Sequence, residues 1–238
     1  MKLDTSDSIK DRCTSALPLS TIEIIGSSGV GKSTLLQTLC RKSDRLQGGI
    51  GLSKWQTLPE WIDVLKFGLT TYLPEPNSTR WFSRTELRSM VYLDAWYRAS
   101  ERPHRSDRAI VWDQGPIYRL AMLREFGPQL MNRPQSERWW NDRLERWAAK
   151  LDLVVWLDAP DRILLERVYT RNREHEIKNK SPEEGYDFLR RYRQTAGQIL
   201  DRLVVERGLK VLRYDTSEAT ADRIADRVLD TLNLRSIV

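Results

Sequence analysis

The sequence predicts an α/β fold in which a five-stranded parallel sheet is flanked by helices and carries a helical lid. Short segments rich in Val, Ile and Leu alternate along the chain with segments whose apolar residues recur at helical spacing. The first apolar segment runs directly into a glycine-rich turn and a helix. A length of 238 residues, 40% of them hydrophobic, suits one such domain with a lid.

Four apolar segments have the length and composition of buried parallel strands: 21–25, 109–112, 151–157 and 209–214. We expect a fifth strand near 49–54 and a short helix near 59–67, within a stretch rich in Gly, Pro and Trp. Right-handed crossovers between such strands place helices on both faces of the sheet.

Helices are expected at 30–40, 83–99 and 221–232, before the third strand, and from Ser181 onward. Ser83 with Glu86, and Ser181 with Glu184, have the spacing of capping boxes. Trp139, Trp140 and Trp147 recur at helical spacing and are expected in the core. We expect residues 1–19 to form a flexible polar leader and 20–238 to form the domain.

The segment after the first strand matches the phosphate-loop pattern GxxxxGK[ST] without deviation. Its backbone N–H groups and the following helix N-terminus are suited to cradle the phosphates of ATP. Lys32 supplies a charge for the β- and γ-phosphates, with no structural partner expected, and the Ser33 hydroxyl is placed to bind Mg²⁺. The predicted nucleotide-binding residues are Gly26, Ser27, Ser28, Gly29, Val30, Gly31, Lys32, Ser33 and Thr34.

A carboxylate follows the second of the four predicted strands, at Asp113. The ends of neighbouring parallel strands face one crevice, so Asp113 is expected beside the phosphate loop. There it can hold Mg²⁺ through water or position the acceptor, and it can equally cap the helix that starts near Pro116.

Three arginines, Arg167, Arg171 and Arg173, lie in a segment at 167–181 that we expect to act as a lid. Arg167 and Arg171 are four residues apart and are expected on one helix face. Cations that close over a migrating phosphoryl group stabilise its charge and exclude water. An exposed helix with ion pairs to Glu166 explains the same pattern. Large apolar side chains are few here, so the segment is expected to bury little surface and to open readily.

Together these motifs resemble the P-loop kinases of the thymidylate kinase and deoxynucleoside kinase type, over roughly residues 20 to 235. The resemblance implies an ATP-dependent enzyme that transfers the γ-phosphoryl group to a nucleotide or nucleoside. It implies that adenine lies near 215–217 and the acceptor between the helices after the second strand. The chain has Asp113-Gln114 where thymidylate kinases usually have Asp-Arg, so the acceptor stays open.

Candidate acceptor contacts are side chains expected in the cleft between residues 55–98 and the Asp113 loop: Glu60, Arg84, Arg88, Gln114 and Arg119. Arg84 and Arg88 share a helix face, which suits an anionic acceptor such as a monophosphate, or forms a solvated basic surface. Catalytic roles are predicted for Lys32, Asp113 and the three lid arginines, and metal binding for Ser33 and Asp113.

Composition says less than the motifs do about which molecules the protein binds. A net charge of +6 favours an anionic ligand, and nucleic acid fits it less well than ATP with a small acceptor. The two cysteines, and the lack of a secretory or membrane-spanning apolar stretch, favour the cytoplasm and no membrane partner. A homodimer is compatible with the sequence. A regulatory GTPase is disfavoured because Asp113 is not followed by x-x-Gly. A polynucleotide kinase and a non-catalytic ATP-binding module stay as alternatives.

Overall fold

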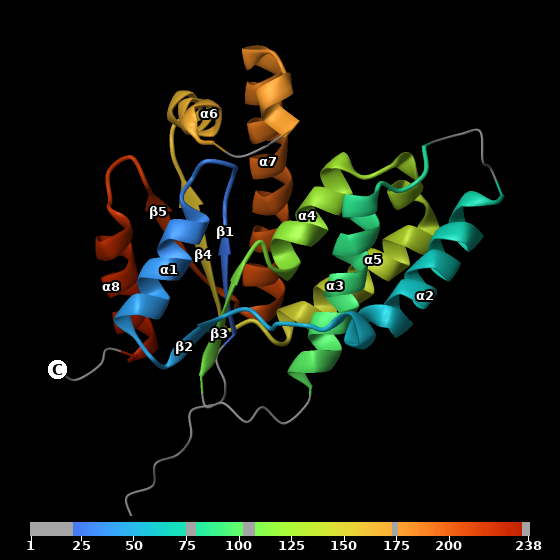
Figure 1. Cartoon of the computed structure of the whole chain (residues 1–238), viewed down its shortest axis with the longest axis horizontal. Helices are drawn as coiled ribbons and strands as arrows, with labels where there is room; N and C mark the ends of the chain where they lie inside the picture. Colours follow the sequence, from blue (N-terminus) through green and yellow to red (C-terminus); the bar gives the residue numbers. More distant parts are fainter. Residues whose placement is uncertain (1–20, 75–79, 102–107, 173–175, 235–238) are drawn as a thin grey trace, which may run out of the picture.

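A computed structural model describes residues 21–74, 80–101, 108–172 and 176–234. The five strands are all parallel and lie in the order β2-β3-β1-β4-β5. The predicted five-stranded parallel sheet flanked by helices is confirmed (Figure 1). The strands span β1 Thr21–Ile25, β2 Leu46–Gly48, β3 Ala109–Asp113, β4 Leu153–Asp158 and β5 Lys210–Asp215.

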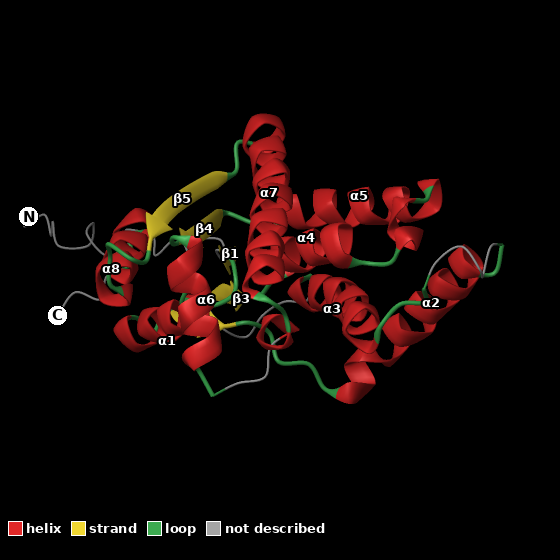
Figure 2. Cartoon of the chain, turned by 90° about the horizontal axis from the view of Figure 1, so that it is seen from above, coloured by secondary structure: helices red, strands yellow, loops and turns green. Residues whose placement is uncertain are grey.

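The helices form layers on both faces of this sheet. On one face lie α1 and α8, and on the other lie α4 and α7, with α3, α5 and α2 successively farther out (Figures 1 and 2). The shorter α6 and the two 3₁₀ turns connect these layers. The bounds are α1 Lys32–Lys42, α2 Lys54–Tyr72, α3 Arg84–Ser100, α4 Pro116–Phe126, η1 Gln129–Asn132, α5 Pro134–Ala148, α6 Asp161–Thr170, η2 Glu176–Asn179, α7 Pro182–Arg207 and α8 Ala221–Leu232.

The region around β2 differs from the prediction. The fifth strand is β2, which ends before 49–54, and the expected short helix at 59–67 is the middle of the 19-residue α2. Gly49 adopts a left-handed backbone with φ 57°, which ends the strand. Ser53 and Gln56 then form a capping box that starts α2.

Both capping boxes expected from the sequence are present. Ser83 accepts a hydrogen bond from the Glu86 N–H at the start of α3, and Ser181 accepts one from the Glu184 N–H at the start of α7. In each case the glutamate side chain also accepts a hydrogen bond from the backbone N–H of the capping serine. These local interactions fix the first turn of two long helices without help from tertiary packing.

The predicted core tryptophans are buried in one cluster between the sheet and the helices α2 to α5 and α7. The Trp147 Nε1 donates a hydrogen bond to the carbonyl of Leu93, and the Trp140 Nε1 donates one to that of Leu120. Burial and satisfied indole N–H groups identify these residues as structural. Within the described residues, no helix is both long and apolar enough to cross a membrane.

The segment predicted as a lid is anchored more firmly than expected. Ile177, in η2, is fully buried and packs in the apolar cluster that contains Leu165 and Val168 of α6. Lys178 donates a hydrogen bond to the carbonyl of Arg171. The expectation that this segment buries little surface was therefore wrong for η2. Arg173 lies outside the described residues, as does the leader at 1–19.

Candidate active site

The phosphate loop turns on three glycines between β1 and α1. Gly26, Gly29 and Gly31 have φ values of 142°, 82° and 95°, which are strained for any other residue. A Cβ at Gly26 would lie 2.2 Å from the carbonyl oxygen of Leu157 in β4, so the loop passes too close to that strand for a side chain. The loop delivers the chain to the N-terminus of α1 at Lys32.

Lys32 is held inside the loop. Its Nζ donates hydrogen bonds to the carbonyl oxygens of Gly26 at 2.7 Å and Ser27 at 3.0 Å, and lies 5.4 Å from the centre of the Tyr118 ring. These two carbonyl partners differ from the prediction that the ammonium has no structural partner. Burial lowers the pKa of Lys32 to about 8, Asp113 opposes that shift, and the nearby Arg171 adds to it.

Asp113 ends β3 beside the loop, as predicted. Its Oδ2 accepts a hydrogen bond from the Ser33 hydroxyl, while its Oδ1 is buried and has no hydrogen-bond partner. A hydroxyl and a carboxylate with an unmet oxygen are the donors that Mg²⁺ takes from a protein when phosphates and water complete its shell. Ser33 and Asp113 therefore fit the ion. Within the described residues, no cluster of three or more His, Cys, Asp or Glu forms a separate metal site.

Glu23 is an acidic residue of this site that the sequence did not point to. It lies fully buried in the middle of β1, and its carboxylate accepts the backbone N–H groups of Ile117 and Tyr118 at 2.8 Å each. It thus ties the start of α4 to the sheet. Burial raises the pKa of Glu23 to about 8, although the two N–H groups and Arg119 lower it. A single acidic residue within an otherwise apolar strand was the available signal.

A cavity of 510 Å³ opens above the phosphate loop. Residues from the loop, from the end of β4 and from the β5–α8 connection line it, including Thr216, Ala219 and Thr220. The connection after β5 is where the kinase resemblance placed adenine. Leu157 and Ile224 supply apolar walls, and the loop supplies the phosphate end.

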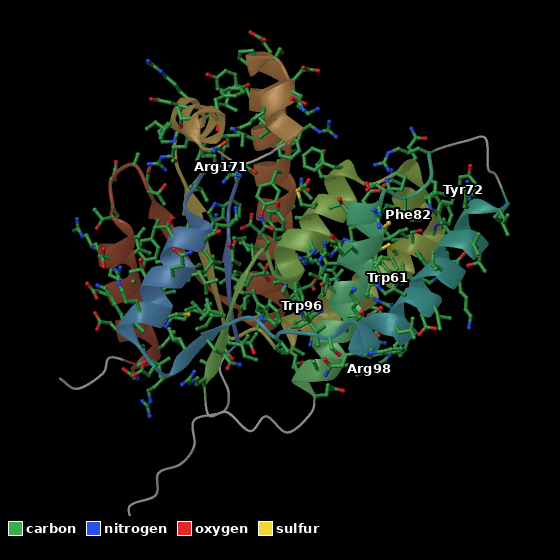
Figure 3. The ribbon with its side chains drawn as sticks, viewed as in Figure 1. Trp61, Tyr72, Phe82, Trp96, Arg98 and Arg171 are labelled. Atoms are coloured by element: carbon green, nitrogen blue, oxygen red, sulfur yellow. The ribbon has the colours of Figure 1, made fainter. Side chains whose placement is uncertain are left out.

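The two described lid arginines lie at different parts of this cavity. Arg167, on α6, donates hydrogen bonds to the side chain and the carbonyl of Thr216, so it holds the wall after β5. Arg171 follows α6 in an extended conformation and lies near Lys32 above the loop (Figure 3). The expectation of one shared helix face was wrong because α6 ends at Thr170. The Nε of Arg171 is buried without a hydrogen-bond partner.

The predicted acceptor residues separate into two groups. Arg84 and Arg88 line a second cavity, of 590 Å³, between α2 and α3. Its other lining residues are Lys54, Thr57, Trp61, Thr85, Val91 and Tyr92. Arg119 reaches the same region from α4, where it donates to Ser89 Oγ at 3.0 Å and stacks over Trp96 and Tyr92.

Two of the predicted contacts lie elsewhere. Glu60 of α2 is 1% exposed, forms an ion pair with Arg98 of α3 at 3.1 Å, and is absent from the lining of the second cavity. The helical spacing of the apolar residues in α2 did not show which face of this helix packs against the rest of the chain. Gln114, whose backbone is left-handed with φ 60°, lines the 510 Å³ cavity above the phosphate loop instead of the second cavity.

Comparison with known structures supports the same fold. A deoxyadenosine kinase from M. mycoides with bound dCTP is 14% identical, with a TM-score of 0.54 over 90% of this chain and 98% of that one. A thymidylate kinase from Candida albicans is 15% identical, with a TM-score of 0.53 over 90% and 91%. This chain is a P-loop protein with a nucleotide kinase-like fold. At these identities, the likeness concerns the fold alone.

Sequence comparisons give one family match and one relative. The family model described as ABC transporter matches residues 16–160, and in this P-loop region the chain belongs to that family. The match ends before α6 and β5, so it covers the phosphate loop and Asp113 but not the lid. A putative thymidylate kinase of Aeropyrum pernix is 30% identical over 103 residues, 40% of this P-loop chain. The chain spans 46% of that relative's length.

Proposed function

We propose that this P-loop protein transfers the γ-phosphoryl group of ATP to a small molecule. The observation that carries the proposal is the convergence of Lys32, Ser33, Asp113 and Arg171 around one end of the 510 Å³ cavity. These groups come from three separate parts of the fold: the loop, the end of β3 and the segment after α6. Phosphoryl transfer needs such an arrangement of cations and a carboxylate around the migrating group.

Each group has a distinct role in the proposed reaction. The loop N–H groups and Lys32 hold the phosphates, and Lys32 exchanges its two carbonyl partners for phosphate oxygens. Ser33 and Asp113 would hold Mg²⁺, which would supply charge neutralisation at the phosphates. Arg171 brings a guanidinium to the γ-phosphoryl group, and its neighbours in the lid limit access of water. Arg167 positions the wall beside adenine through Thr216. Arg173 retains its predicted lid role as a proposal.

The acceptor is proposed to bind in the second cavity. Three cationic side chains, Lys54, Arg84 and Arg88, line it, and none of the described acidic residues does. Trp61 and Tyr92 offer flat surfaces for a planar ring. An anionic, ring-containing acceptor fits this lining, so a nucleoside monophosphate is favoured over an uncharged nucleoside. The buried tryptophans remove one reason for invoking a nucleic-acid substrate, since Trp139, Trp140 and Trp147 belong to the core.

A screen of acceptors with labelled ATP and Mg²⁺ tests this function. Nucleoside monophosphates, nucleosides, a sugar and an oligonucleotide with a free 5′ end are compared for phosphorylated product, beside ATP hydrolysis without acceptor. We expect product with monophosphates, and a loss with Arg88→Ala but not with Arg162→Ala, an exposed arginine on α6. Transfer to nucleosides alone contradicts the anionic acceptor. ATP binding without transfer to any of them contradicts the kinase proposal.

A further inference from the structure

Helix α2 exposes a continuous apolar stripe on its outer side. Trp55 is 83% exposed, and the other five members are 42–65% exposed. Six of the ten large hydrophobic side chains that are exposed within the described residues lie on this helix or its C-cap residue. The stripe consists of Trp55, Leu58, Ile62, Leu65, Leu69 and Leu73. Such a concentration on one element marks an interaction surface, whereas scattered exposed leucines do not.

The stripe is not the face that holds α2 to its own chain. The opposite face, which includes Thr57, Val64 and Gly68, is buried, and the neighbouring element is α3. Figures 1 and 2 show α2 at the outer edge of the molecule, farthest from the sheet. The packing of the monomer therefore leaves the outer stripe uncovered.

The spacing of the stripe is suited to packing against α2 of a second copy of the chain. From Trp55 to Leu69 its members are separated by three, four, three and four residues, the seam of a coiled coil. The central members Leu58, Ile62, Leu65 and Leu69 are separated by four, three and four residues, which reads the same in both directions. A symmetric antiparallel pair therefore sets Leu58 against Leu69 of a second copy, and Ile62 against Leu65.

The charges beside the stripe favour the same pairing. Asp63 and Lys66 are both exposed and follow Ile62 and Leu65 on the same side of the seam. In the antiparallel pair, Asp63 of one copy lies within about one turn of Lys66 of the second. The opposite charges attract in both symmetry-related positions.

The area is sufficient for a specific dimer. The six side chains expose on the order of 600 Å² together, so a symmetric pair buries about 1,200 Å², the lower limit of standard interfaces. The helix extends about 28 Å, which gives several consecutive layers of contact. The core of such an interface is apolar with polar edges, which is the arrangement on α2.

We propose that a second copy of this chain covers the stripe, with the two α2 helices packed antiparallel about a twofold axis. The dimer also supports the second cavity, because Lys54, Thr57 and Trp61 line that cavity from α2. This consequence for the acceptor rests on the proposed function, whereas the dimer itself does not.

Sedimentation velocity over a wide range of protein concentration tests the dimer. We expect wild type to sediment as a dimer, and Ile62→Asp/Leu65→Asp to raise the dissociation constant by about 100-fold or more, since two apolar layers then enclose carboxylates. The matched control is Val205→Asp on α7, 85% exposed and remote from α2 in sequence, which should stay dimeric. Circular dichroism checks that each variant is folded. A folded wild type that is monomeric throughout overturns the proposal, as does a dimer unaffected by the double change.

Cross-linking tests the orientation independently of folding effects. In a background with Cys13→Ser and Cys40→Ser, the double variant Leu58→Cys/Leu69→Cys should oxidise to a covalent dimer. The single variants should not, because neither position meets its own copy in the antiparallel pair. Equal cross-linking of both single variants indicates parallel helices and overturns the twofold arrangement. Absence of cross-linking in all three overturns the α2 interface. ATP binding by the variants, measured alongside, separates failure of this inference from failure of the proposed function.

Discussion

Individual residues of the site differ in how far the sequence could reveal them. Lys32 and Ser33 were predicted from nine consecutive residues, because the loop itself supplies the turn and the helix start that position them. Glu23 was not, because its partners Ile117 and Tyr118 are more than ninety residues away and reach it only through the pairing of β1 with β3. The same packing requires a glycine at position 115, since a Cβ there would lie 2.9 Å from the Glu23 carboxyl carbon.

Lys32→Ala should lower turnover by about 1,000-fold, roughly 4 kcal/mol of transition-state stabilisation. The protein should stay folded, because the change removes a buried ammonium that contacts loop carbonyls and belongs to neither apolar core cluster. Steady-state kinetics with the preferred acceptor, together with ATP affinity by calorimetry, measure the effect. Lys42→Ala, on the same helix and away from the cavity, is the control. Near-normal turnover in Lys32→Ala contradicts the assigned site.

Glu23→Gln should remove part of the pH dependence of stability. The pKa of Glu23 is about 8 in the folded protein and near 4.5 when unfolded, so the folded state binds more protons between these values. Stability from this group is therefore greatest below about pH 4.5, falls as pH rises toward 8 and is level above it. Glutamine does not titrate, and its NH₂ cannot accept one of the two N–H groups, which costs about 1–3 kcal/mol at low pH.

Urea unfolding between pH 5 and 9 measures that difference. The slope of stability against pH should be flatter in Glu23→Gln than in wild type. Glu166→Gln, at an exposed position on α6, should leave the slope unchanged. Parallel curves for wild type and Glu23→Gln would show that the carboxyl group is ionised throughout this range in the folded protein.

At the scale of elements, local signals located the helices that cap themselves. Ser83 and Ser181 each carry a glutamate three residues later, so α3 and α7 could be placed to within a residue. Strand β2 has only three residues, too few to show the alternation of apolar and polar side chains that predicts a strand. It ends at Gly49 because of that residue's left-handed backbone. The burial within η2 was not predicted, because Ile177 is one apolar residue whose burial depends on Leu165 and Gly185, which lie on two other helices.

Arg171→Lys tests the segment after α6. A lysine keeps the charge but cannot donate two parallel hydrogen bonds to a phosphoryl group, so kcat should fall by about 10- to 100-fold, roughly 1.4 to 2.7 kcal/mol. ATP affinity should change less, because the loop and Lys32 bind most of the triphosphate in the ground state. Arg162→Lys is the matched control on the exposed side of α6. A loss of ATP affinity with kcat unchanged would show that Arg171 binds the ground state and the transition state equally and does not act in the chemical step.

At the scale of the whole molecule, the chain has two halves, the sheet with the phosphate loop and the helical part formed by α2 to α5. They meet at the end of β3. The alternation of strands and helices predicted the half that holds ATP, since the topology of a parallel sheet follows from its crossovers. The helical half was less predictable, because α2 carries apolar side chains both on its buried face and on the outer stripe, and helical spacing alone did not separate the two faces. Asp113 ends β3 beside the phosphate loop, while Arg119, on the next helix, reaches Trp96 and Tyr92 on the side of the proposed acceptor cavity.

This arrangement predicts that the two ligands stabilise the protein cooperatively. Each ligand alone, at about 100 times its dissociation constant, adds about 2.7 kcal/mol, or roughly 5 to 10 °C in Tm for a chain of this size. A non-hydrolysable ATP analogue and the acceptor together should exceed the sum of the separate shifts, because each orders groups around Asp113 that the other contacts. Differential scanning calorimetry measures the four states.

The control for this cooperativity is Lys32→Ala, in which the analogue should lose most of its shift while the acceptor keeps its own. Arg88→Ala should show the reverse, because Arg88 lines the second cavity and contributes nothing to the ATP cavity. Strictly additive shifts in wild type would mean that the two cavities bind independently. The end of β3 would then not bring donor and acceptor together, and an acceptor site elsewhere on the molecule would have to be sought.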